Sequence, residues 1–255
     1  MATVRDQRID TPPRRSFPER RFDHLFFCSM TWLMLVTVFV GFAPSYYLAG
    51  VLRSPLPSSI IHIHAIVFSL WIVVLIAQTG LTAGGRISVH RKLGIAGFAL
   101  ALLMLMVGLW AATDSLARGV PAPDPLGLYI IPTTNIVAFT VLILFAYRAR
   151  FDSGAHKRIV IIASTALMTA PIARWRFDWS HHGRFIHTSL LRAECFSYAF
   201  VLLLIAYDFL VKRRIHRATI WGSSFLVAIQ QVALQFGKTA IWHSIAGRVQ
   251  AMVQH

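Results

Sequence analysis

The histidines are the residues of this chain whose type and position most directly suggest a chemical role. The sequence has 255 residues and 11 histidines. A neutral imidazole is the commonest metal ligand and a usual axial ligand of haem iron. His64, His90, His156 and His187 are therefore candidate ligands of haem b, and the first three are also candidate ligands of a transition-metal ion.

Two of these histidines stand at the start of long apolar runs. His90 lies in Val-His-Arg-Lys-Leu-Gly, and His156 lies in Ala-His-Lys-Arg. If both runs are membrane helices, the two imidazoles lie on the same side at similar depth, which is the arrangement that two axial ligands need to hold a planar cofactor. A histidine beside Arg or Lys at a helix end is also typical of a residue solvated by lipid headgroups, so both interpretations stay open.

His64, Trp71 and Gln78 follow a spacing of seven residues in another run. That spacing predicts one helix face about 21 Å long, turned into the protein because a lipid-facing glutamine is costly. His62, two positions before His64, should point away from it. The later segment with His181, His182 and His187 could meet His64 in a second site, although a simple interfacial loop explains the same residues.

Other polar residues interrupt the remaining apolar runs. Such groups at membrane depth are expensive and indicate either a functional site or hydrogen bonds between helices. A polar intramembrane cavity would be lined by Trp71, Gln78, Asn135, Arg174, Glu194, Gln231 and Gln235. Glu194 could instead pair with Arg174, Arg192 or Lys238 for structure alone.

The elements that must position these residues are membrane helices. The chain is 56% hydrophobic and 14% charged, whereas a soluble domain carries about a quarter charged residues. A span needs about 20 apolar residues. An all-α, polytopic transmembrane helical bundle is therefore predicted, with spans near 25–47, 60–80, 93–112, 128–148, 157–174, 193–211 and 219–238.

Charge gives the expected orientation. The net charge is +15, and the basic residues flank the apolar runs, where they meet lipid rather than nucleic acid. Roughly two thirds of Lys and Arg fall on one side, which predicts an inner N-terminus and an outer C-terminus. The expected divisions are a basic cytoplasmic tail at 1–24, a seven-helix domain at 25–238 and an outer tail at 239–255, helical or disordered, in a multi-pass protein of the bacterial inner membrane.

These motifs together resemble a known family. The run from His64 to Ala-Gln-Thr, the start His90-Arg91-Lys92-Leu93-Gly94 and the later His156-Lys157-Arg158 resemble multi-pass bacterial membrane proteins grouped under domain of unknown function 2306. The likeness covers roughly residues 60–175, and Lys-Arg-Ile after His156 departs from the aromatic or Met pair expected there. The resemblance implies a helical bundle with histidines arranged as in b-type cytochromes, without an established activity.

Three functions remain open at this point. The leading one is a membrane oxidoreductase or electron-transfer protein that holds haem b through His90 and His156, with His64 and His187 or His182 as an outer pair, and exchanges electrons with a quinone or another redox partner. The second is a cofactor-free membrane enzyme or small-molecule carrier. The third is an accessory subunit of a membrane complex. Nucleotide-binding, Ser-hydrolase, zinc-protease and c-type haem motifs are absent from the sequence.

Overall fold

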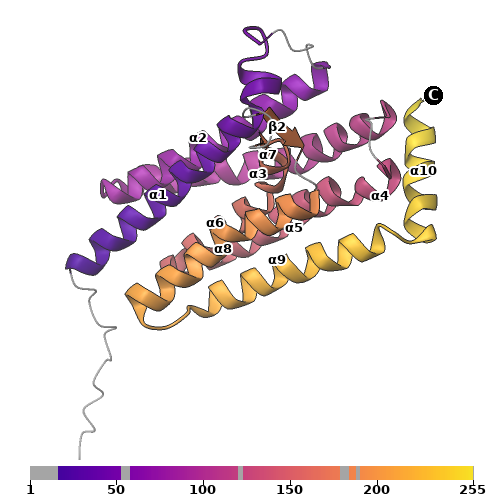
Figure 1. The fold of residues 1–255 in the computed structure, drawn as a ribbon. Coiled ribbons are helices and arrows are strands. Elements are labelled where there is room, and N and C mark those ends of the chain that lie inside the picture. Colours follow the sequence, from indigo (N-terminus) through magenta and orange to yellow (C-terminus); the bar gives the residue numbers. More distant parts are fainter. Residues whose placement is uncertain (1–16, 53–57, 120–122, 179–183, 188–189, 255) are drawn as a thin grey trace, which may run out of the picture.

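The computed structural model describes residues 17–52, 58–119, 123–178, 184–187 and 190–254. The architecture is all-α, with one short antiparallel hairpin in which Arg176 lies opposite His187 (Figure 1). The elements, in chain order, are α1 (Phe17–Phe42), η1 (Ala43–Tyr47), α2 (Ser59–Ala83), α3 (Ile87–Ala117), α4 (Pro125–Leu128), α5 (Ile130–Arg148), η2 (Ala149–Phe151), α6 (Ser153–Ala166), α7 (Thr169–Ala173), β1 (Arg176–Asp178), β2 (Arg184–His187), α8 (Leu190–Lys212), α9 (Arg217–Phe236) and α10 (Ala240–Gln254).

Each of the predicted spans coincides with helix. Among the residues that the structure describes, five helical segments are long and apolar enough to cross a membrane: Arg21–Tyr47, Ser59–Ala83, Ile87–Ala117, Pro125–Phe151 and Arg192–Lys212. The predicted fifth span is divided between α6 and α7, and the predicted seventh, α9, is helical but more polar. Helix α1 begins at Phe17, inside the expected tail 1–24, and the segment 239–255, expected to be helical or disordered, contains the helix α10.

Proline explains why the predicted fifth span is broken. Pro171 has no N–H to give to the carbonyl of Leu167, and its ring crowds that carbonyl. The chain accordingly leaves α6 after Ala166 and resumes in α7 at Thr169. Pro132, by contrast, is the third residue of α5, where a missing N–H is tolerated, and α5 continues unbroken.

Small residues let the helices approach closely. Two glycines of α3 do so: Gly97 lies against Val74 of α2, and Gly108 lies against Phe68 of α2 and Ile136 of α5. The order of packing is α1 on α2, α2 on α3, α3 on α5, and α5 on both α6 and α9, as Figure 1 shows. Apolar side chains from these helices form a large core, and Ile130 and Ile131 of α5 form a smaller one with Ala233 of α9.

A buried ion pair joins three helices at one end of the bundle, which we call the His156 end. Arg158 of α6 donates from Nε and Nη2 to the carboxylate of Asp208 in α8, and the two side chains are 3% and 0% exposed. Asp208 also accepts from Thr219 Oγ1 (2.6 Å) and from the backbone N–H of His216 (3.1 Å) at the start of α9. One carboxylate therefore fixes α6, α8 and α9 together.

A second buried carboxylate ties α1 to the same end. Asp23 accepts a hydrogen bond from Tyr207 of α8 and forms ion pairs with Lys157 (3.0 Å) and Lys212 (3.3 Å). The Lys157 ammonium also lies 4.4 Å from the ring centre of Phe27. These contacts satisfy charges that would otherwise be costly in an apolar bundle.

The opposite end, which we call the His64 end, is crossed by α10 (Figure 1). Gln250 and Gln254 donate to the carbonyls of Leu116 and Ala117 in the last turn of α3, and the Leu116 carbonyl also accepts from the N–H of Gly119. His243 Nε2 lies 3.0 Å from Asp124 Oδ1, the residue that caps α4. Helix α10 is thus attached largely by hydrogen bonds.

We expect the Arg158–Asp208 pair to be the most sensitive polar contact of the fold. Asp208→Asn leaves a buried guanidinium without its counter-charge, which should lower the free energy of unfolding by about 3–5 kcal/mol. The matched control is Asp114→Asn. Because Arg118, the i,i+4 partner of Asp114, is exposed, loss of this ion pair should lower the free energy of unfolding by less than about 1 kcal/mol. Unfolding in detergent, followed by circular dichroism, measures both, and equal small losses would contradict this role.

The attachment of α10 should depend on pH. The pKa of His243 is raised first by the hydrogen bond of its ring to the Thr239 carbonyl and second by Asp124. The pKa of Asp124 is lowered mainly by the hydrogen bond from the N–H of Gly127. The His243 contribution is therefore complete below its unfolded pKa of about 6.5 and is lost as pH rises through the higher folded pKa. The Asp124 contribution is complete above about 3.9 and is lost as pH falls through the lower folded pKa.

Hydrogen-exchange protection factors across α10 measure this dependence, because they correct for the intrinsic effect of pH on exchange. Protection should be greatest from about pH 4 to 6.5 and decline toward pH 9. In Asp124→Asn the cap acceptor and the bond of His243 to the Thr239 carbonyl remain but the charge of Asp124 is gone, so the decline should become smaller. An unchanged pH profile in that variant would show that another group controls α10.

Candidate functional site

Two of the predicted ligands meet at the His156 end. The imidazole rings of His90, near the start of α3, and His156, near the start of α6, have centres 6.4 Å apart and planes at 89°. Metal–nitrogen bonds of about 2 Å, together with the roughly 1 Å from each nitrogen to its ring centre, would separate two trans imidazoles by about 6 Å. The spacing therefore fits two axial ligands on opposite sides of one metal.

The second nitrogen of each ring is held by the protein backbone. His156 Nδ1 lies 2.8 Å from the carbonyl oxygen of Ala146 in α5, which leaves Nε2 for a ligand. The His90 ring interacts with the backbone of Gln78, and its buried Nδ1 has no hydrogen-bond partner among the described residues. Metal-binding histidines usually have this pattern, in which one nitrogen is oriented by a carbonyl and the other faces the metal.

Gln78 brings α2 to the same place. Its Nε2 lies against Gly94, one turn after His90 on α3, where a Cβ atom would be 3.4 Å away. Its Oε1 is buried and has no hydrogen-bond partner in the described part of the chain. The pair of histidines is thus accompanied by a buried amide oxygen without a bond.

The salt bridges of the fold position His156. Lys157 and Arg158, the next two residues of α6, are tied to Asp23 and Asp208, and Asp152 caps the helix by accepting from the N–H groups of Gly154 and Ala155. Rotation of α6 about its axis would break these contacts. The direction of the His156 side chain is therefore fixed by its sequence neighbours.

The three histidines predicted to bind a metal ion do not form one cluster. Within the ranges that the structure describes, no group of three or more His, Cys, Asp or Glu side chains could hold a metal ion. His64 is 14 residues from Gln78 along α2, or about 21 Å. His90 and His156 are thus a pair of candidate ligands, and the described part of the chain places no third His, Cys, Asp or Glu side chain with them in a metal-binding group.

His64 lies at the other end of the bundle with Arg174. Its ring stacks on Phe68 with centres 4.0 Å apart, and its buried Nδ1 has no partner among described side chains. Arg174, at the end of α7, acts on it electrostatically. His62 instead pairs with Tyr46, as the opposed directions predict. The partners predicted for His64, which are His181, His182 and the side chain of His187, lie outside the described residues.

The residues predicted to line one polar cavity occupy separate places. Trp71 is buried, donates to Ser164 Oγ (3.3 Å) and lies edge-on to Phe139. Asn135 Oδ1 accepts from Gln230 Nε2 at 2.8 Å. Gln231 and Gln235 are exposed and bond to Tyr198 and Lys238. The buried amide of α9 is thus Gln230, one position before the predicted face.

Glu194 is a predicted cavity residue whose carboxylate is buried. Its side chain is 2% exposed, and its Oε2 has no hydrogen-bond partner in the described ranges. Of the cations predicted to pair with it, Arg174 donates to the carbonyl of Ala170 and Lys238 to Gln235. We find no ion pair of Glu194 with either of these two residues.

Two surface hollows are described, and neither contains a predicted cavity residue. The larger, about 290 Å³, lies between α5 and α9 beside Trp242, and the smaller, about 220 Å³, lies along α5. Both are lined mainly by apolar side chains that face lipid if the helices span a membrane. Neither hollow is lined by His90 or His156. The histidine pair is favoured over the polar cavity because its two rings meet, whereas the predicted cavity residues lie apart.

Sequence reasoning missed the ion pairs that hold this end together. Lys157 and Arg158 count as loop charges in the positive-inside argument, but Arg158 is buried against Asp208. A signal was present for the partner, because Asp208 lies inside an apolar run and a buried carboxylate requires a cation. The buried face of α9 likewise follows a three- and four-residue spacing, through Thr219, Gly222, Ser223, Leu226 and Gln230.

Comparison of the chain with protein-family models, curated proteins and solved structures found no match. The resemblance to domain of unknown function 2306 therefore stays a prediction. Function has to be argued from the geometry of the chain itself.

Proposed function

We propose that this chain is an integral-membrane redox protein that holds the iron of haem b between His90 and His156. The observation that carries the proposal is the facing pair of imidazoles, 6.4 Å apart and on different helices. Each ring also has one nitrogen directed to the backbone and one left for a ligand. The helical segments that are long and apolar enough to cross a membrane support its place in a membrane.

The number of protein ligands favours haem over a bare metal ion. A structural metal ion usually takes four protein ligands and a catalytic one at least three. Only two histidines meet here, and the described residues offer no larger group. Haem iron requires only axial ligands from the protein, because the porphyrin supplies the other four.

The residues around the pair would control ligand strength and position. The Ala146 carbonyl accepts from His156 Nδ1 and so favours the tautomer whose Nε2 can bind iron. Gln78 offers a buried amide beside His90. Haem would supply one-electron exchange, and two histidine ligands leave its iron no open position for substrate.

We further propose seven spans with an inner N-terminus, in the inner membrane of a bacterium. Helices α6 and α7 together extend from the His156 end to the His64 end, a length of about 31 Å for 21 residues. Helix α9 packs along α5 and α6 within the same bundle (Figure 1). The excess of Lys and Arg at the His156 end supports an inner position for that end.

Spectroscopy of the purified protein tests the haem site. Full-length protein produced in cells supplied with haem precursor should show a Soret band, with sharp α and β bands after dithionite reduction. His90→Ala and His156→Ala should each abolish these bands, because each removes an axial ligand. His62→Ala, which changes a histidine at the other end of α2, is the matched control and should keep them.

A conservative variant separates ligation from folding. His156→Met should retain haem with the raised reduction potential of His/Met ligation. A folded, helical wild-type protein that stays colourless after haem addition would refute the proposal. So would an unchanged spectrum in both His90→Ala and His156→Ala.

A further inference from the structure

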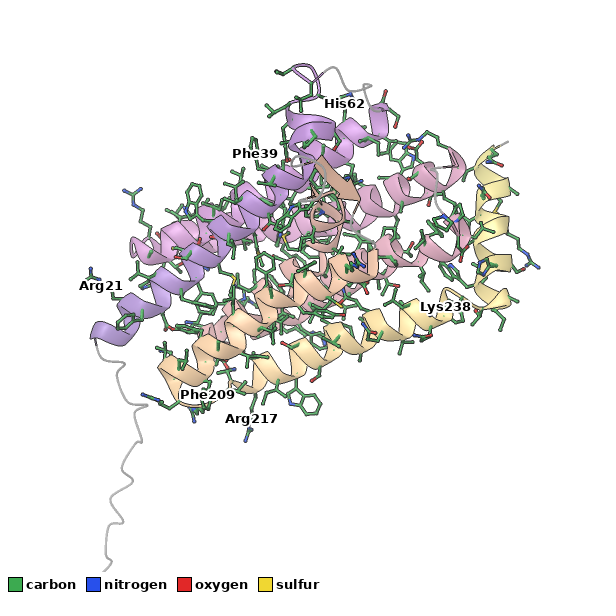
Figure 2. The ribbon with its side chains drawn as sticks, in the orientation of Figure 1. Arg21, Phe39, His62, Phe209, Arg217 and Lys238 are labelled. Atoms are coloured by element: carbon green, nitrogen blue, oxygen red, sulfur yellow. The ribbon has the colours of Figure 1, made fainter. Side chains whose placement is uncertain are left out.

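The outward face of α9 is polar, whereas the corresponding face of α3 is apolar. A helix turns by about 100° per residue, so the side opposite the buried face of α9 consists of exposed residues spaced three and four apart: Trp221, Ser224, Ala228, Gln231 and Gln235. Figure 2 shows α9 along one edge of the bundle, between Arg217 and Lys238. On α3, the side chains exposed between Ile95 and Trp110 are all apolar.

Two amides on the outward face of α9 are costly in lipid. Gln231 lies five residues, or about 8 Å, before the end of α9 at Phe236. If α9 spans the membrane as proposed, Gln231 therefore lies within the hydrocarbon. A lipid tail offers an amide no hydrogen-bond partner. The outward face of α9 thus requires polar cover from protein.

Each of the two amides uses one polar atom within the chain and leaves the other. Gln231 Nε2 donates to the Tyr198 hydroxyl of α8 at 3.2 Å, so Gln231 Oε1 is left to accept. Lys238 Nζ donates to Gln235 Oε1 at 3.3 Å, so Gln235 Nε2 is left to donate. Neither remaining atom has a hydrogen bond within the described ranges. The face therefore offers one acceptor and one donor, separated by one helical turn.

We propose that this face of α9 binds the same face of a second copy of the chain, side by side in the membrane; this rests on the span proposed for α9. Both copies insert in the same orientation, so their α9 helices run parallel. In a twofold contact the same surface is used by both protomers. Gln235 Nε2 of each protomer then donates to the partner's Gln231 Oε1, which gives two identical hydrogen bonds.

The spacing along the face suits two parallel helices. Alternating steps of three and four residues repeat every seven, which is the pattern by which helices pack along one line. Ser224 and Ala228 are small, so the two backbones can approach closely there. A different membrane protein would have to supply an acceptor and a donor one turn apart, whereas a second copy supplies both by symmetry.

Förster energy transfer between copies of the full chain tests this contact. Copies labelled at the N-terminus with a donor or an acceptor dye, in phosphatidylcholine liposomes at several protein-to-lipid ratios, give a dimer dissociation constant. Gln231→Leu and Gln235→Leu should each weaken dimerisation about tenfold or more, because each removes both intermolecular bonds. Tyr198→Phe is the matched control for the bond within one copy, and it should dimerise like the wild type.

Two further variants test the geometry. The double variant Gln231→Leu/Gln235→Leu should dimerise no more weakly than either single variant, since all three lack the same two bonds. In a chain with Cys28→Ser and Cys195→Ser, which removes both free thiols, Ala228→Cys should form a disulfide-linked dimer on oxidation. Met106→Cys, at an exposed position of α3, should not.

A wild-type chain that stays monomeric at every protein-to-lipid ratio would overturn the proposal and leave the face to a different protein. Equal dissociation constants in the wild type and both single variants would also overturn it, as would additive effects in the double variant. Haem absorption and helix content should be unchanged in all of these variants, so the haem proposal and the dimer fail separately.

The proposed span is checked on its own. Ala228→Cys in the weakly dimerising Gln231→Leu chain, without the native thiols, should resist a membrane-impermeant maleimide. Labelling would refute the span of α9 and the dimer with it. Protection from labelling, together with a monomeric wild type, would refute the dimer alone.

Discussion

The contact between Arg158 and Asp208 is the constraint on which the arrangement of this bundle depends. In a membrane bundle, helices gain little from hiding apolar surface from one another, because lipid is equally apolar. Polar ties and close backbone contacts therefore decide how they dock. Asp208 accepts bonds from α6 and from both the backbone and a side chain of α9, and Asp23 adds α1 through Lys157 and Lys212. Four helices are thus aligned by two carboxylates.

The same ties connect structure to chemistry. His156 precedes the two anchored cations of α6, so the ion pairs that hold the helix also aim the imidazole at His90. Ion pairs do not satisfy every polar group, because His90 and Gln78 beside this pair, and His64, Thr169 and Glu194 elsewhere in the bundle, carry buried polar atoms without bonds among the described residues. The histidine pair is therefore held by satisfied charges and bordered by free hydrogen-bonding capacity.

Sequence alone predicted much of this arrangement, and the reasons for its failures are physical. Apolar run length located all the major helices, and a seven-residue spacing predicted the inward face of His64, Trp71 and Gln78. The approach of His90 to His156 followed from two helix starts on one side. The sequence could not show which side chains pair, because Asp208 could have met any nearby cation. Gln230, and not the predicted Gln231, is buried on α9, since one residue turns a helix face by about 100°. The division between α6 and α7 needed the three-dimensional effect of Pro171.

The length of α3 has a consequence for how the protein would sit in a bilayer. Its 31 residues measure about 46 Å, against a hydrocarbon core of about 30 Å. A free helix of that length could tilt until its apolar part matched the lipid. Here α10 is fastened to the carbonyls of Leu116 and Ala117 and to α4, so a change of tilt would drag a crosswise helix through the headgroup layer. Bilayers of different thickness would therefore have to deform around the protein, rather than the protein reorienting within them.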